Sequence, residues 1–114
     1  MRKSLLLAAL LAANGWAQVV PSEVLVPSGA QTDTVYSKNG KFQGSYKLKS
    51  GKISDLAAQA RARAEAQGYK SVENQVSDQA AALVLEKGDK TLQISIDSSS
   101  GAISYVVKLE QNGN

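Results

Sequence analysis

Apolar and polar side chains alternate over much of the chain, which is the pattern of β-strands with one buried face. From Lys41 to Lys49, apolar or small residues occupy the even positions and polar or basic residues the odd ones. Successive side chains of a strand point to opposite faces, so this stretch predicts a strand with one apolar and one basic face. The preceding dipeptide Asn39-Gly40 favours a two-residue type I′ hairpin, because both positions of that turn need positive φ. We therefore expect a partner strand at Thr32 to Lys38.

Further strands are predicted in the second half of the chain. In the two strongest, aliphatic or aromatic residues hold every second position, whereas the weakest has only Val72 and Val76 on one face. Short connections such as Gly88-Asp89 indicate antiparallel neighbours, because a parallel connection needs about a dozen residues or more. In chain order, the predicted strands are Ser71 to Ser77, Ala81 to Glu86, Thr91 to Asp97 and Ile103 to Glu110.

A helix is predicted between the two groups of strands. The run from Asp55 to Gln67 contains six alanines and no Gly, Pro or β-branched residue, so its helix propensity is high. Ser54 is expected as the N-cap, with Asp55 in the first turn, where the helix dipole favours an anion. Gly68 is expected to end the helix, with Tyr69 making the apolar contact of a Schellman motif. The apolar stripe is mostly alanine and must pack closely against a sheet; it consists of Leu56, Ala57, Ala60 and Ala64.

These elements predict an α+β fold of two layers, with one Ala-rich helix packed on one face of a four- or five-stranded antiparallel sheet. The other face is expected to be solvated, as antiparallel sheets allow. The domain spans residues 32–110 and is followed by a polar, frayed tail at 111–114. An extended leader at 18–31 carries both prolines, and its five aliphatic residues favour a position partly on the domain.

The first residues have the pattern of a cleaved secretory signal. Arg2 and Lys3 precede nine consecutive apolar residues, Leu5 to Ala13, and small residues follow at Gly15 and Ala17, the positions that signal peptidase reads. A nine-residue helix rises only about 14 Å, too short for a membrane core of about 30 Å. We expect cleavage after Ala17 and export to the periplasm or the medium. Without a cysteine at the new N-terminus, no lipid anchor is expected.

Composition excludes several kinds of site. The chain has no Cys and no His, which rules out disulfides, Cys/His zinc sites, cysteine nucleophiles and Ser-His-Asp triads. Asp97 to Gly101 resembles the start of a calcium loop, but Lys108 stands where an EF-hand needs its closing glutamate. We expect no cofactor, no bound metal and no enzymatic activity. A small hydrolase that uses Asp or Glu is the alternative from another class.

Charge indicates one candidate binding surface. Arg2 and Lys3 leave with the signal, so the net charge falls from +3 to +1, and the remaining basic residues gather between residues 36 and 70. Clustered lysines can bind an anionic polymer, because binding releases the counterions of the polymer, or they can contact an envelope protein. The alternative without a binding function is that the lysines keep the chain soluble and protect an edge strand from pairing with other chains. Without outward aromatic residues, no sequence-specific nucleic-acid binding is expected. The oligomeric state stays open. The candidate binding residues are Lys38, Lys41, Lys47, Lys49 and Lys52.

The order of elements is similar to that of small exported bacterial domains of unknown function, and it resembles PepSY-type domains. In the latter, a helix precedes strands that end in an Asp-x-x-x-Gly turn; here these are Ala57 to Gln67 and then Leu92 to Gly101. PepSY domains are associated with the inhibition or modulation of envelope peptidases. The resemblance implies a peptidase-modulating domain that acts by adding a strand to the edge of a sheet.

Overall fold

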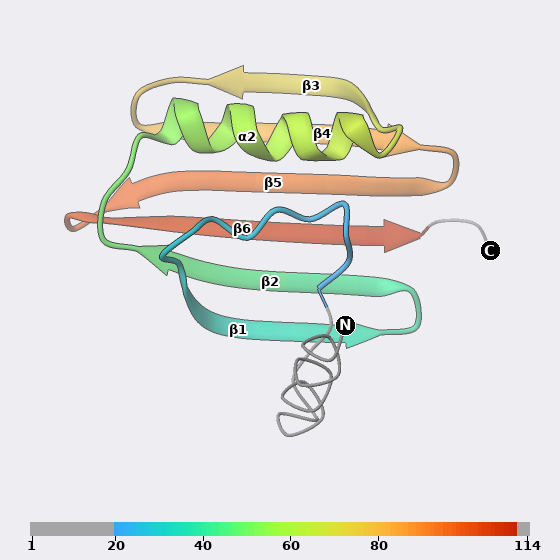
Figure 1. Cartoon of the computed structure of the whole chain (residues 1–114), viewed down its shortest axis with the longest axis horizontal. Helices are drawn as coiled ribbons and strands as arrows, with labels where there is room; N and C mark the ends of the chain where they lie inside the picture. Colours follow the sequence, from blue (N-terminus) through green and yellow to red (C-terminus); the bar gives the residue numbers. More distant parts are fainter. Residues whose placement is uncertain (1–19, 112–114) are drawn as a thin grey trace, which may run out of the picture.

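Six antiparallel strands form a single open sheet in the computed structural model, which describes residues 20–111 (Figure 1). The expected α+β class is confirmed, but the expected strand number of four or five was too low. The weakest stretch forms an edge strand although it has no apolar face, because backbone pairing with its neighbour suffices. The order across the sheet is β1-β2-β6-β5-β4-β3. The strands are β1 (Gln31–Lys38), β2 (Lys41–Leu48), β3 (Lys70–Val76), β4 (Ala80–Lys87), β5 (Lys90–Ser99) and β6 (Ala102–Gln111).

Tight turns set the register of the hairpins. Asn39 and Gly40 both have positive φ, 48° and 79°, and Lys38 faces Lys41, which confirms the two-residue type I′ turn. Ser100 and Gly101 repeat this geometry between β5 and β6, with φ of 53° and 79°. The two-residue connections leave no freedom for the strands to slip, so the two faces of the sheet are fixed.

The helix α2 (Ile53–Ala66) begins earlier than its sequence predicts. Lys52, not Ser54, is the N-cap, and no side chain caps the helix there. Ile53 is 4% exposed, so burying this residue under the first turn decides where the helix begins. The predicted end is confirmed: the N–H of Tyr69 donates to Ala64 O at 3.1 Å, and Gly68 has a φ of 99°, as in a Schellman motif.

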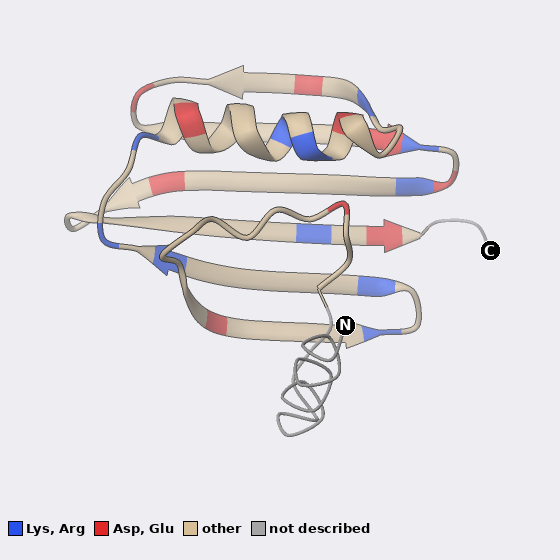
Figure 2. Ribbon diagram, viewed as in Figure 1, with Lys and Arg blue, Asp and Glu red and all other residues tan. Residues whose placement is uncertain are grey.

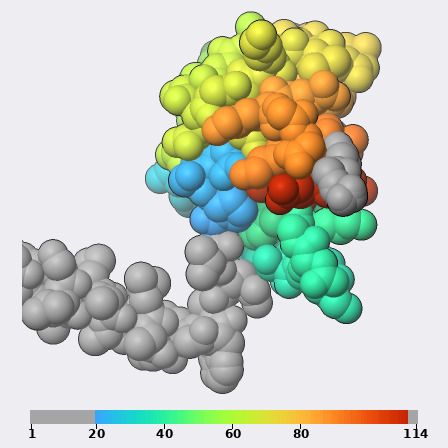
Figure 3. Space-filling model, turned by 90° about the vertical axis from the view of Figure 1, so that its right-hand side faces the viewer, coloured from blue at the N-terminus to red at the C-terminus, as the bar shows by residue number. Residues whose placement is uncertain are grey.

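One face of the sheet is covered by two different segments. The alanine stripe of α2 is buried against β3, β4 and β5, as expected. Residues 20–30 form a leader that crosses β6 and β2 beside the helix (Figures 1 and 3). The side chains that fill the space between these layers come from alternate strand positions, among them Phe42, Tyr46, Leu83, Leu85, Leu92, Ile94, Ile96, Tyr105 and Val107.

Specific polar contacts hold the leader in place. The hydroxyl of Tyr105 donates to Leu25 O at 2.8 Å, and the hydroxyl of Tyr69 donates to Glu23 at 2.9 Å. Between these contacts Val24 is 3% exposed and belongs to the core. The leader therefore covers the half of the sheet that the single helix does not reach.

Both edges of the sheet carry an irregularity. The register of β1 against β2 shifts between Thr32 and Thr34, and that of β3 against β4 shifts between Ser71 and Glu73. The second shift breaks the alternation by which Val72 was expected to share a face with Val76. Both valines are exposed and neither belongs to the core.

The predicted signal at residues 1–17 lies outside the described residues, as do residues 112–114 of the predicted tail. Within residues 20–111, α2 is too short and too polar to cross a lipid bilayer.

Candidate functional site

The face of the sheet turned away from α2 and the leader has no covering segment among residues 20–111. We call this surface the open face and assign its members from the strand register and the alternation with buried residues. From edge to edge it consists of Gln31, Thr34, Tyr36 and Lys38 of β1; Lys41, Gln43, Ser45 and Lys47 of β2; Ala102, Ser104, Val106, Lys108 and Glu110 of β6; Thr91, Gln93, Ser95, Asp97 and Ser99 of β5; Ala80, Ala82, Val84 and Glu86 of β4; and Lys70, Glu73 and Gln75 of β3.

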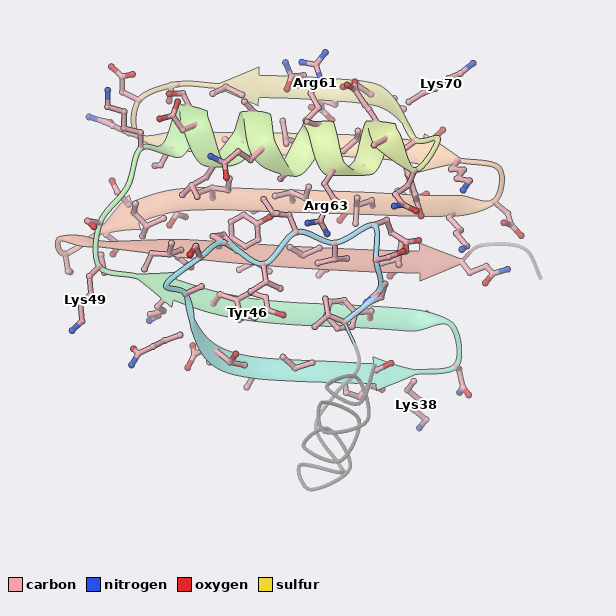
Figure 4. All side chains as sticks on the ribbon, viewed as in Figure 1. Lys38, Tyr46, Lys49, Arg61, Arg63 and Lys70 are labelled. Atoms are coloured by element: carbon pink, nitrogen blue, oxygen red, sulfur yellow. The ribbon has the colours of Figure 1, made fainter. Side chains whose placement is uncertain are left out.

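The five candidate lysines divide into two groups at opposite ends of β2. Lys38 and Lys41 face each other beside the hairpin turn. Lys47 lies about 20 Å from Lys41, at about 3.3 Å per strand residue. Lys49 follows the end of β2, and Lys52 occupies the N-cap position of α2. Figure 4 shows Lys38 and Lys49 at the two ends of the β1–β2 hairpin.

A sixth lysine joins the two groups. Lys108 of β6 pairs with Gln43, so it lies on the open face between Lys41 and Lys47. Alternation in the sequence already places Lys108 on the polar side of its strand. The sequence does not show that β6 pairs with β2, and this neighbour relation is what brings Lys108 among the candidates.

The strand that carries most of these lysines is not at an edge of the sheet. β2 lies between β1 and β6, so the interpretation that its lysines protect an edge is wrong for Lys41 and Lys47. They lie on the face of an interior strand, where they do not block strand addition.

The other half of the open face is acidic. Over β1, β2 and β6 the open face carries four lysines and Glu110, a net charge of +3. Over β5, β4 and β3 it carries three acidic residues and Lys70, a net charge of −2. Figure 2 shows the charges along each strand. The three acidic side chains are Asp97, Glu86 and Glu73.

A row of uncharged side chains crosses both halves of the open face, between the charged residues near its two ends. Ser45, Val106, Ser95 and Ala82 stand opposite one another on four neighbouring strands, and they form one row across the middle of the open face. Ser45 and Val106 are half-buried although no other segment of residues 20–111 covers them. The middle of the open face is therefore flat and has a mixed polar and apolar character.

Within residues 20–111, no three of the Asp and Glu residues lie close enough to hold a metal ion. A hollow of about 250 Å³ at one end of the sheet is lined by Glu23 and Glu110 together with Lys41 and Lys90. Burial alone would raise the pKa of Glu23, but a hydrogen bond from its own backbone, another from Tyr69 and nearby lysine charges hold that pKa below its ordinary value. An ionised Glu23 is unsuited to act as a general acid at neutral pH.

No protein-family model matches the chain, and no curated protein matches it at a significant level.

Proposed function

We propose that the chain is an exported, non-enzymatic binding module whose open face docks on a protein. The observation that carries this proposal is the division of the open face into a basic half over β1, β2 and β6 and an acidic half over β5, β4 and β3, with one row of uncharged side chains crossing both halves. A partner whose surface has the reverse arrangement would be attracted to both halves at once. Complementary charge of this kind raises association rates and fixes orientation.

A protein suits this surface better than an anionic polymer does. A uniformly negative chain would be attracted to the lysines but repelled by Asp97, Glu86 and Glu73. Glu110 stands directly opposite Lys41, which weakens the attraction of the basic half itself. Even with Lys108 between them, the two groups of lysines at the ends of β2 are interrupted by the uncharged Ser45 and Val106, so they do not form the continuous basic stripe on which polyanions are held.

The face is also a better contact surface than either edge of the sheet. A peptide that adds a strand needs a regular row of unpaired backbone groups. The register shifts in β1 and β3 interrupt that row, and such bulges are a common protection of sheet edges. A peptidase-modulating role by strand addition is for this reason the less favoured candidate.

Site-specific photo-crosslinking in the producing cell tests the proposal. A photoreactive amino acid replaces Ser95, in the middle of the open face, or Ala58, an exposed position on α2 that serves as the matched control. We expect crosslinks to protein from position 95, few from position 58, and a lower yield from position 95 when Lys41→Glu is added. Equal yields from the two positions, or crosslinks from position 95 to a polymer only, would overturn the proposal.

A further inference from the structure

The open face has the charge arrangement that a second copy of the same chain would need. We infer that two copies pair through their open faces, about a two-fold axis that runs parallel to the strands between β6 and β5. This inference rests on the proposed function, since it identifies the partner of the same surface.

The direction of the axis follows from the charges. Rotation about an axis parallel to the strands places β1, β2 and β6 of one copy over β3, β4 and β5 of the other. The basic half, net +3, then lies over the acidic half, net −2, twice in the dimer. A two-fold axis that lies in the same plane but perpendicular to the strands would place the basic half of one copy over the basic half of the other. The charges therefore favour only the first arrangement.

One pair of residues makes this arrangement specific. Lys41 faces Glu110, Glu110 faces Thr91, and Thr91 faces Glu86, so Lys41 and Glu86 stand in the same row across the sheet. Their strands, β2 and β4, are equally far from the proposed axis. Lys41 of each copy therefore lies over Glu86 of the other. Within one chain the two residues are three strand spacings apart, about 14 Å, too far for a direct contact.

The corners of the sheet contribute less to the proposed dimer contact than the middle of the sheet does. The same row ends in Lys38 on β1 and Lys70 on β3, two like charges that the rotation would bring toward each other. Two twisted sheets pack with their strands at about 30°, which separates the corners while the middle stays in contact. The pairing of Lys41 with Glu86 lies nearer the axis and is retained.

Shape and area suit the pairing of two sheets. Facing sheets pack about 10 Å apart, and the small residues of the central row leave room for that approach. Six strands of about eight residues give a face of roughly 700 Å² at the usual strand spacing. This is close to the ~800 Å² per partner of a standard interface. Since the face is only partly apolar, we expect a weak, salt-sensitive dimer.

Sedimentation equilibrium of the mature chain tests the inference through a charge exchange. The samples are the wild type, Lys41→Glu, Glu86→Lys and the double variant with both changes. We expect a wild-type dimer whose dissociation constant rises at least about tenfold in each single variant, because symmetry places the affected pair twice. The double variant should return to within about threefold of the wild type. Arg61→Glu makes the same change of net charge at an exposed position of α2, away from the open face, and should leave the dimer intact.

Several results would overturn the inference. These are a wild-type chain that stays monomeric at about 1 mM, a double variant that is not rescued, or an Arg61→Glu variant that dissociates as readily as Lys41→Glu. The melting temperature of each variant shows whether it is folded. The outcomes for the two proposals are distinguishable: if the chain is monomeric but position 95 still crosslinks to another protein, the dimer fails and the proposed function stands.

Discussion

The ring of Tyr46 folds back over Gly44, two residues earlier on the same face of β2. A Cβ atom at position 44 would come within 2.7 Å of the phenolic oxygen. Tyr46 cannot easily move aside, because it is 2% exposed and its ring packs edge-on against Tyr105, with 6.2 Å between the ring centroids. Glycine is therefore required at position 44 by the space that its neighbour occupies.

The first prediction follows from this contact. Gly44→Ala should destabilise the chain by about 1–3 kcal/mol, as overpacking of a core does. In a domain of this size each kcal/mol lowers Tm by roughly 4–8 °C, which thermal unfolding followed by circular dichroism measures. Ser45→Ala, one residue further and on the open face, is the matched control and should shift Tm little. Equal shifts in the two variants would contradict the account of this site.

A second prediction compares two buried tyrosines. The hydroxyl of Tyr105 donates to Leu25 O and ties the leader to the sheet, whereas the hydroxyl of Tyr46 is buried without a hydrogen-bond partner among the described residues. Tyr105→Phe should cost about 1–3 kcal/mol, since it leaves a carbonyl unsatisfied. Tyr46→Phe should be neutral or slightly stabilising, since it removes an unpaired hydroxyl. Chemical denaturation measures both free energies of unfolding, and the reverse order of effects would be incompatible with these contacts.

Alkaline pH provides a third prediction. Burial, a hydrogen bond to Glu23 and the charge of Glu23 all raise the pKa of Tyr69 above its ordinary value of 10. The folded chain thus keeps a proton that the unfolded chain loses, so this contribution to stability is complete below about pH 10 and falls as pH rises above it. Tm measured from about pH 8 to about pH 11 should fall, and less steeply in Tyr69→Phe. Tyr36→Phe changes an exposed ring and is the control, for which we expect the same slope of Tm against pH as in the wild type. The prediction is refuted if the slope in Tyr69→Phe equals that of the wild type.

The sequence pattern predicted which face of each strand is buried, but it did not predict which strands are neighbours in the sheet. Alternation identified the buried side of β2, β5 and β6, and Gly68 correctly marked the end of the helix, because these features depend on local geometry. The pairing of β6 with β2 depends on the path of the whole chain. The charge halves of the open face, and the place of Lys108 in them, follow from that pairing and were therefore missed.

Two other features were not predicted correctly, because they depend on contacts between residues that are far apart in the sequence. Ser54 satisfied the local rule for an N-cap, but burial of Ile53 moved the start of the helix. The leader looked only partly bound from its composition, yet Val24 is a core residue and Leu25 accepts a hydrogen bond from a residue 80 positions later. Neither effect is visible in a local window of sequence.

Export is tested by a fourth prediction. If residues 1–17 are a cleaved signal, the protein recovered from the periplasm or the medium should begin at Gln18. Mass spectrometry of the intact protein measures this directly, with Ala17→Lys, which replaces a small residue at the cleavage position, as the variant expected to remain unprocessed. Recovery of the full 114-residue chain from the cell interior would contradict the prediction.

The most direct test of the pairing of open faces is an NMR measurement of paramagnetic broadening between copies. One copy carries a paramagnetic label, and the broadening of the amide signals of another copy is measured. The chain has no cysteine, so Gln75→Cys on β3 takes a single nitroxide label. Mixed with ¹⁵N-labelled wild-type chain, it should broaden the signals of Thr34 and Tyr36 on β1, because the two-fold axis places β3 of one copy over β1 of the other. Within one chain these strands are the two opposite edges of the sheet. Broadening confined to α2 or to β3, or none at concentrations where the chain sediments as a dimer, would contradict the account.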